Sequence, residues 1–184
     1  RDMKVTWRQF SLALKNDSLT KRDGESSHAE AARQSHRVHR VIRKASVDHG
    51  ASLIELYSEF GIRKHIMEKF FDDQLILEVL AEKKLPEELI KSADDESLDA
   101  ELQAEIDSAI EAAGGDIGVP TIVFMSKDGK RLGYFGPVLN ELPQTLEESL
   151  NIWDGLEKPA TTSSFYEIKR SRPGSPNVFS AARC

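Results

Sequence analysis

A change in hydrophobic period near Gly114 and Gly115 constrains the fold of this chain more than any other feature of its sequence. Residues 28–112 carry apolar side chains at the spacing of amphipathic helices. Residues 121–125 are instead a short, continuously apolar run of the kind found in buried strands. Residues 126–135 follow with an Asp-Gly turn and a second apolar run, which is typical of a β-hairpin. We therefore expect an α/β fold in which an all-helical block precedes a hairpin.

The segments on either side of these two regions extend the pattern. Residues 5–10 alternate in polarity and include β-branched and aromatic side chains, so they predict a strand. Residues 140–155 predict a last helix. Residues 159–184 are rich in Ser, Pro and Arg and predict a tail, of which the segment 165–168 is expected to dock on the body. The helices expected inside the helical block cover residues 28–48, 51–60, 65–82, a short stretch that begins at Pro86, and 98–113.

Composition argues against several classes of protein. The 184 residues carry a net charge of −6, which does not favour non-specific binding to nucleic acid. The sequence has no apolar run of about 18 residues, so we expect no membrane span. The one cysteine, Cys184, excludes an intrachain disulfide and a four-cysteine zinc site. Such sparing use of cysteine is typical of a reducing compartment, so we expect a cytoplasmic protein.

Histidines and charged residues offer further candidate sites. His36 and His39 have a spacing that zinc sites use, but no Cys or carboxylate stands at a matching position, so we expect two surface histidines and no metal. A basic stripe with helical spacing consists of Arg33, Arg37, Arg40 and Lys44. The stripe is either a solvated helix face or a site for an anionic substrate or an acidic partner, and the solvated face is favoured. The acidic stretch 94–111 predicts a second solvated face.

Pro120 stands immediately before the predicted strand at residues 121–125. Proline cannot donate a hydrogen bond to a sheet, so its position needs a physical reason. A cis bond between Val119 and Pro120 would leave the backbone of Val119 free to pair with another group. Because only about 5–6% of X-Pro bonds in folded proteins are cis, the pattern alone favours a trans proline at the start of a strand.

The region around Pro120 resembles a known family. Val119-Pro120-Thr121, the hairpin, and Phe135-Gly136-Pro137-Val138 before a helix are similar to the second half of a DsbA-type thioredoxin fold. Within that family the chain resembles the actinobacterial mycothiol-dependent nitroreductase branch. The stretches that carry this resemblance are Ser11-Leu12-Ala13-Leu14 with Asn16, Leu56-Tyr57 with Gly61-x-Arg63-x-His65, Phe135-Gly136-Pro137-Val138-Leu139, Leu150-x-x-Trp153-Asp154, and Phe165-Tyr166-Glu167-Ile168-Lys169-Arg170. Together they extend over nearly the whole chain.

The resemblance implies a domain organisation. Residues 1–27 and 113–158 would form a thioredoxin-like core that is incomplete at its N-terminus. Residues 28–112 would form the helical insertion that DsbA-type proteins carry, and residues 159–184 would form a C-terminal tail.

The resemblance also implies a set of site residues. Val119 and Pro120 would form a cis-proline loop that faces a redox Cys-x-x-Cys. Asn16 and His65 match polar residues that line the thiol site of the nitroreductase branch. His28 stands near the position of a tyrosine in that branch, so the chain departs from the family pattern there.

The reactive cysteines of the family have no counterpart in this sequence. Family members begin with a strand and a Cys-Pro-x-Cys or similar motif that opens a helix, whose N-terminus lowers the pKa of the first cysteine. Cys184 cannot replace that cysteine, because it lies in a polar tail without a Cys-x-x-Cys. The missing strand would lie in the centre of the sheet, between residues 5–10 and 121–125. Without this strand, several backbone groups would be left without hydrogen bonds, at a cost of roughly 1–3 kcal/mol each. We therefore expect the natural protein to contain the missing strand and cysteine motif. A partner chain that occupies the place of the missing strand is the less favoured alternative.

The function implied by the resemblance is thiol–disulfide-type oxidoreduction, with mycothiol or a similar small thiol as the electron donor. The partners would be this thiol and an oxidised or electrophilic substrate, with no tightly bound cofactor, no nucleic acid and no membrane. A homodimer is one option. Two alternatives stay open, namely a redox-inactive thioredoxin-fold binding module and a DsbA-like isomerase that uses glutathione. A cysteine at the first position of the Cys-x-x-Cys would support the reductase, and another residue there would support either alternative.

Overall fold

The computed structural model describes residues 3–16 and 27–171, without the side chains of residues 27–29. The chain divides into two compact units, Arg1–Ile106 and Asp107–Cys184. The described part combines helices with one small antiparallel sheet, which agrees with an α/β class.

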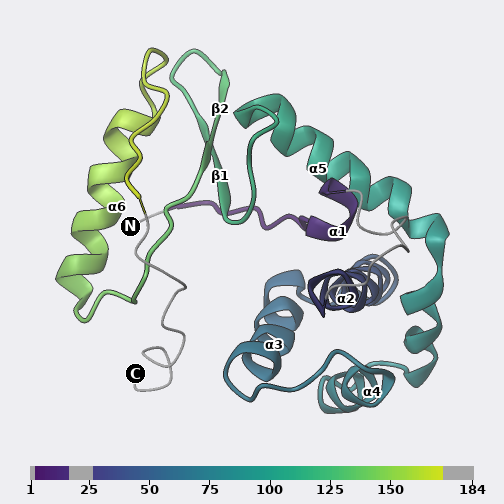
Figure 1. Cartoon of the computed structure of the whole chain (residues 1–184). Helices are drawn as coiled ribbons and strands as arrows, with labels where there is room; N and C mark the ends of the chain where they lie inside the picture. Colours follow the sequence, from purple (N-terminus) through teal and green to yellow (C-terminus); the bar gives the residue numbers. More distant parts are fainter. Residues whose placement is uncertain (1–2, 17–26, 172–184) are drawn as a thin grey trace. The chain divides into compact units, whose positions relative to one another are not determined.

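The first unit is built from helices (Figure 1). They are α1 (Leu12–Lys15), α2 (Ser27–His49), α3 (Leu53–His65), α4 (Asp73–Glu82), the 3-10 helices η1 (Glu87–Asp94) and η2 (Glu96–Leu98), and α5 (Asp99–Ala113), which continues into the second unit. Side-chain caps begin several of them, among them α3 and α4. Ser52 accepts a hydrogen bond from the backbone of Glu55 at the start of α3, and Asp72 accepts one from Leu75 at the start of α4.

The core of the first unit forms around α2, against which α3 and η1 pack. The apolar residues of α2 recur at helical spacing and line one side of the helix. The buried cluster consists of Val38, Val41, Ile42, Ala45, Leu56, Phe60, Ile76, Val79, Leu80, Leu89 and Ala93. Burial of each large aliphatic or aromatic side chain contributes about 1.5–3 kcal/mol, so this cluster strongly stabilises the unit.

The second unit contains the sheet, a hairpin of β1 (Thr121–Met125) and β2 (Arg131–Phe135). The two strands are antiparallel, and Val123 lies opposite Gly133. Gly133 lies against the end of α5, where an added Cβ would come within 2.6 Å of the Cβ of Ala113. The absence of a side chain at this position therefore allows the helix end and the hairpin to approach closely.

The helix α6 (Leu146–Ala160) packs on the hairpin within the second unit (Figure 1). It begins with a capping box, in which Thr145 and Glu148 accept hydrogen bonds from each other's backbone. The ring of Phe124 in β1 lies 5.9 Å from that of Trp153 in α6, measured between centroids. This aromatic contact joins the helix to one face of the hairpin.

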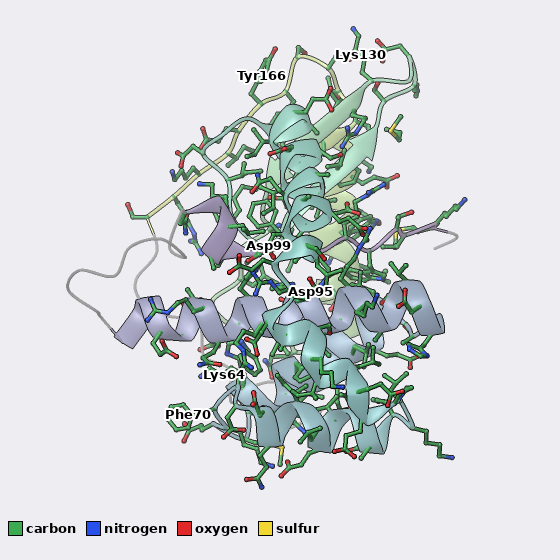
Figure 2. The ribbon with its side chains drawn as sticks, turned by 90° about the vertical axis from the view of Figure 1, so that its right-hand side faces the viewer. Lys64, Phe70, Asp95, Asp99, Lys130 and Tyr166 are labelled. Carbon is green, nitrogen blue, oxygen red and sulfur yellow. The ribbon has the colours of Figure 1, made fainter. Side chains whose placement is uncertain are left out.

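The predicted hairpin and the predicted helix at residues 28–48 are confirmed. The predicted helix at 140–155 is confirmed in type, but it begins later because Pro143 precedes the Thr145 cap. The docking of the segment 165–168 is confirmed for Phe165, whose backbone carbonyl accepts a hydrogen bond of 2.9 Å from the Tyr134 hydroxyl. Tyr166, by contrast, is 81% exposed and points away from the body (Figure 2).

The predicted strand at residues 5–10 is wrong, because these residues have no regular secondary structure. A strand needs a neighbour for its backbone hydrogen bonds, and the sheet of the described residues contains β1 and β2 alone. The alternation of the sequence is not matched by alternating burial. Val5 and Trp7 are more than half exposed, whereas Gln9, at the same spacing, is buried.

The predicted helix boundaries around Gly61 are also wrong. The helix α3 continues through Gly61 to His65, and α4 begins at Asp73 rather than at residue 65. Glu68 has a positive φ of 55°, which a continuous right-handed helix does not allow. The interruption therefore falls at residues 66–72.

Within residues 3–16 and 27–171, no helix combines the length and the apolar character needed to cross a bilayer.

Candidate functional site

The loop before β1 presents a free backbone segment in the second unit. The peptide bond between Val119 and Pro120 is cis in the structure. The carbonyl of Pro120 accepts a 2.8 Å hydrogen bond from the backbone N–H of Gly136, and the Thr121 hydroxyl donates a 2.7 Å bond to the carbonyl of Gly118. Among the described residues, the N–H and C=O of Val119 have no hydrogen-bond partner. Val119 as a residue is 42% exposed, so a molecule outside the chain can approach it.

Asn16 and His65 both belong to the first unit. Asn16 is the C-cap of α1, where its backbone N–H donates to the carbonyl of Leu12, and its side chain is exposed. His65 is the last residue of α3 and is also exposed. No hydrogen bond joins these two side chains in the part of the chain that the structure describes. His28 lies in α2, but its side chain falls outside the described ones.

Lys64, next to His65, is held by aromatic rings. Its ammonium group lies 5.4 Å from the ring centroid of Phe70 and 5.6 Å from that of Phe71 (Figure 2). A cation over the face of an aromatic ring is attracted by the ring's quadrupole. This contact turns Lys64 toward the segment after α3.

A buried chain of hydrogen bonds connects the N-terminal segment to α2 and α5 in the first unit. The hydroxyl of Ser11 lies 2.9 Å from Nδ1 of His36, and Nε2 of His36 lies 2.9 Å from Oδ1 of Asp99. Arg40 donates to the same carboxylate through Nε at 2.7 Å and Nη2 at 2.5 Å. Asp99 stands at the start of α5, beside α2 (Figure 2). The Asp99 carboxylate therefore joins α5 to α2 directly, and His36 extends the connection to Ser11.

The charged groups in this chain of hydrogen bonds favour the ionised form of Asp99. Burial alone would raise the pKa of Asp99, but the hydrogen bonds from Arg40 and the nearby His36 hold it below its usual value. The same carboxylate raises the pKa of Arg40. Burial lowers the pKa of His36, and Asp99 opposes this effect only in part. The arrangement is thus an ion pair between Arg40 and Asp99, with the His36 imidazole within hydrogen-bond distance of the same carboxylate.

Serine, histidine and aspartate in this order also occur in nucleophilic catalysis, but here the hydroxyl cannot reach a substrate. Ser11 is only 1% exposed, and its oxygen accepts a hydrogen bond from the backbone of Leu14 as the N-cap of α1. The contact therefore has a positioning role. It fixes the start of α1 on α2, and α1 ends at Asn16.

The expectation of two surface histidines is wrong, because His36 and His39 are both buried. His39 receives the side chain of Gln9, whose Nε2 lies 3.2 Å from Nδ1 of the ring and donates a 2.9 Å bond to the His39 carbonyl. Burial, and to a lesser degree His36, lowers the pKa of His39 to about 4. Within the described residues, no group of three or more His, Cys, Asp or Glu side chains could hold a metal ion.

The expectation of two solvated faces is wrong for Arg37 and Arg40, which pair with carboxylates of the acidic stretch, whereas Arg33 and Lys44 pair with Glu30 and Asp48 within α2. Arg37 contacts Asp94 and Asp73 at 2.8 Å, and Arg40 contacts Asp99. The helix α2 thus meets the acidic residues of η1 and α5 through a row of ion pairs. Because these guanidinium groups already have carboxylate partners, they offer little for an anionic ligand.

Sequence reasoning missed Gln9, Ser11 and Asp99 as parts of a network. The sequence pattern does not identify Gln9 and Ser11 as buried, because Val5 and Trp7 at the same spacing are exposed. No local signal identifies Asp99, which lies 63 positions from His36 in the chain and belongs to a stretch of many acids.

Comparison with protein families gives one match of wide extent. A family model described as "Rv2466c-like: Mycothiol-dependent nitroreductase Rv2466c" matches residues 1–170. The match includes both units, the loop at Val119, and the residues Asn16 and His65.

Proposed function

The chain belongs to the Rv2466c-like family of mycothiol-dependent nitroreductases, and on this basis we propose that it acts as a thiol–disulfide-type oxidoreductase that draws electrons from mycothiol or a similar small thiol. The family assignment supports an oxidoreductase that uses mycothiol. The proposal adds the mechanism, the site and the cellular location, which is the cytoplasm.

The mechanism requires a reactive thiolate. A cysteine of low pKa would attack the oxidised or electrophilic substrate, and a mixed disulfide with the small thiol would follow. In the full cycle two thiols each give up one hydrogen atom and form a disulfide, while the acceptor gains the two hydrogens. Cys184, the one cysteine of this sequence, lies outside the described residues. We assign the reactive role to a Cys-x-x-Cys that this sequence does not contain.

The free backbone of Val119 is the observation that best supports the proposed site. Its N–H and C=O lack partners in the described part of the chain, and the loop around them is braced by the bonds at Gly118 and Pro120. A mixed disulfide that lies along this loop would pair with both groups as a short strand does. Pro120, which cannot donate a hydrogen bond, would shape the groove next to them.

Asn16 and His65 would supply polar contacts to the bound thiol, and His28 would lie nearby. Asn16 and His65 are exposed, and their side chains have no hydrogen-bond partner among the described residues. Mycothiol is rich in hydroxyl and amide groups, which exchange donors and acceptors readily with an amide and an imidazole.

We further propose a DsbA-like thioredoxin fold, with residues 28–112 as its helical insertion. The order of hairpin and final helix, β1, β2 and α6, supports this assignment, because it is the order in which a thioredoxin fold ends. A strand that precedes this sequence would complete the sheet next to β1, whose outer edge is unpaired within the described residues.

The experiment uses the protein expressed from its whole reading frame, including whatever precedes Arg1. The protein is incubated with mycothiol and 1,3-dinitrobenzene, and loss of the nitro compound is followed by absorbance. We expect turnover with mycothiol and, after rapid alkylation, a mixed disulfide detected by mass spectrometry. Turnover that survives replacement of every cysteine by serine would contradict the proposal.

Variants test the site itself. Asn16→Ala and His65→Ala are each expected to raise KM for mycothiol about 5- to 10-fold, the effect of losing one hydrogen bond of about 1–1.4 kcal/mol. His49→Ala is the matched control, because His49 is an exposed histidine that also ends a helix. An equal effect of His49→Ala and His65→Ala would argue against a role for His65.

A redox-inactive binding module is the second candidate, because the unpaired backbone of Val119 could hold a ligand without any reaction. In that case the whole protein would bind mycothiol with the same dependence on Asn16 and His65, but no mixed disulfide would form. Glutathione in place of mycothiol serves as a further comparison, because a glutathione-dependent isomerase would prefer it.

A further inference from the structure

Two buried histidines of α2 contact the N-terminal segment, residues 3–16, in different ways. His36 and His39 stand three residues apart and therefore lie on the same side of the helix. They meet Ser11 and Gln9, which stand two positions apart in the segment. All four side chains are buried. The proposed redox chemistry uses neither histidine, so their role in the molecule needs a separate explanation.

The contact between Gln9 and His39 determines where the proton of this imidazole lies. Nε2 of Gln9 donates a 2.9 Å hydrogen bond to the backbone carbonyl of His39. An oxygen in place of this nitrogen would face another oxygen, so the amide group points its nitrogen toward His39. The same nitrogen lies 3.2 Å from Nδ1 of the imidazole. Because an amide nitrogen donates and does not accept, Nδ1 is an unprotonated acceptor, and His39 is neutral while this contact exists.

Protonation of His39 would leave Gln9 without a suitable orientation. A protonated imidazole donates through both nitrogens, so Nδ1 would direct its hydrogen at the amide nitrogen, which is also a donor. Rotation of the amide by half a turn would let its oxygen accept from Nδ1, but this oxygen would then face the His39 carbonyl. Either orientation brings two like groups together in a buried place, where a lost hydrogen bond is costly.

His36 keeps its hydrogen bonds in both charge states. Its Nδ1 lies 2.9 Å from the Ser11 hydroxyl, which can donate to a neutral imidazole or accept from a protonated one. Its Nε2 lies 2.9 Å from the Asp99 carboxylate, which accepts from an N–H in either state. His36 therefore serves as an internal comparison for His39, since both belong to the same helix and meet the same segment.

The acidic groups around α2 do not favour a proton on His39. Carboxylates from α4, η1 and α5 contact this helix through its arginines and include Asp73, Asp94, Asp99, Glu101 and Glu105. Glu96 of η2 acts on Arg40. On α2 itself, His36 acts against a proton on His39.

The other charged groups near α2 do not offset the burial of His39. Arg8 in the N-terminal segment and Lys15 in α1 are cations, which oppose a further positive charge. In α3, Glu59 and Arg63 pair with each other. Burial is the main cause that lowers the pKa of His39, to about 4. The neutral form of His39 is thus the form that fits the folded first unit.

We propose that Gln9 and His39 form a proton-sensitive latch, which holds the N-terminal segment on α2 while His39 is neutral and weakens this hold when His39 binds a proton. The latch belongs to the fold of the first unit and does not depend on the proposed function. The helix α1 begins at Leu12, after its cap Ser11, and has four residues. So short a helix is not stable alone, so release of the segment also removes α1. Acid is therefore expected to open one local part of the unit.

Amide hydrogen exchange of α1, followed by NMR on the protein expressed from its whole reading frame, measures this opening. The backbone N–H groups of Lys15 and Asn16 donate to the carbonyls of Ser11 and Leu12, and they exchange when the segment opens. Release lets the pKa of His39 rise from about 4 toward 6.5. The protection factors of the two amides, corrected for the intrinsic exchange rate at each pH, should therefore fall about 3- to 10-fold per pH unit between about pH 6 and pH 4.5. Low concentrations of urea should leave this local opening unchanged, whereas amides of α4 that exchange by global unfolding should exchange faster.

Variants assign the effect to one histidine. His39→Gln offers an oxygen that can accept from Gln9 but binds no proton, so the protection of α1 should change less than about 2-fold per pH unit. His36→Gln is the matched control and should keep the pH dependence of the native chain. Gln9→Ala removes the hydrogen bonds to His39 and should lower the protection of α1 about 5-fold at pH 7.

The native chain alone can refute the latch, even where a variant does not fold. The latch is disproved if the protection of α1 does not change with pH, or if urea and acid accelerate exchange in α1 and α4 alike, which would indicate global unfolding. It is also disproved if His39→Gln responds to pH as the native chain does, or if His36→Gln loses the response to the same extent as His39→Gln.

Discussion

Replacement of Asp99 by alanine is the perturbation whose effect the structure defines best. The carboxylate accepts hydrogen bonds of 2.7 and 2.5 Å from Arg40 and lies 2.9 Å from Nε2 of His36. The Arg40 side chain is 8% exposed, so without Asp99 its charge would stay buried with one remaining acceptor, the carbonyl of Ala93. Removal of one partner from such a pair costs about 3–5 kcal/mol, because the other charge is left uncompensated. We expect Asp99→Ala to reduce the free energy of unfolding by this amount.

Urea unfolding at neutral pH, followed by far-UV circular dichroism, measures the loss. Glu101→Ala is the matched control, because Glu101 also lies in the first turn of α5 and pairs with an arginine, Arg43, at 2.7 Å. Glu101 is 53% exposed, so its removal should cost about 0.2–1 kcal/mol. Equal losses for the two variants would show that burial does not strengthen the dependence of Arg40 on Asp99, and would refute the reasoning.

Three further predictions concern other parts of the chain. His39 binds a proton near pH 6.5 in the unfolded chain but only near pH 4 in the folded chain, so the free energy of unfolding should fall by about 3 kcal/mol as the pH drops across this range. Urea titrations at several pH values measure this fall, and His39→Gln should make it smaller. Gly133→Ala should destabilise the second unit by about 1–3 kcal/mol, because the new Cβ would collide with Ala113; a neutral effect on the thermal midpoint would show that the helix end yields. Thr145→Ala should cost about 1 kcal/mol through loss of the cap of α6, and Thr145→Ser should recover most of it in the same unfolding assay.

The predicted helices and the hairpin were accessible to sequence analysis because their signals are local. Repeated apolar residues within α2 specify both a helix and its buried side. The Asp-Gly turn and the short apolar run specify a hairpin. The helix boundaries near Gly61 were harder to predict from the sequence. A helix tolerates a single glycine in its interior, so α3 continues past Gly61 and ends at His65.

The strand predicted at residues 5–10 shows a different limit. Its alternating pattern is a property of the segment, but a strand also needs hydrogen bonds from a neighbour, and none is present among the described residues. The site residues show the same limit. Asn16, His65 and Val119 were selected by resemblance, whereas the free backbone of Val119 became visible only in three dimensions.

The sequence alone determined the alternation of helical and strand periods, the turn chemistry and the family to which the chain belongs, because each of these depends on residues near one another or on their order. The tertiary structure alone decided that His36 and Arg40 are buried and that Asp99 is their partner. In the sequence, a charged residue on a helix looks the same whether its side chain faces water or a carboxylate from a distant helix. The partner is set by how the helices pack, since electrostatic energy depends on distance in space and on exclusion of water.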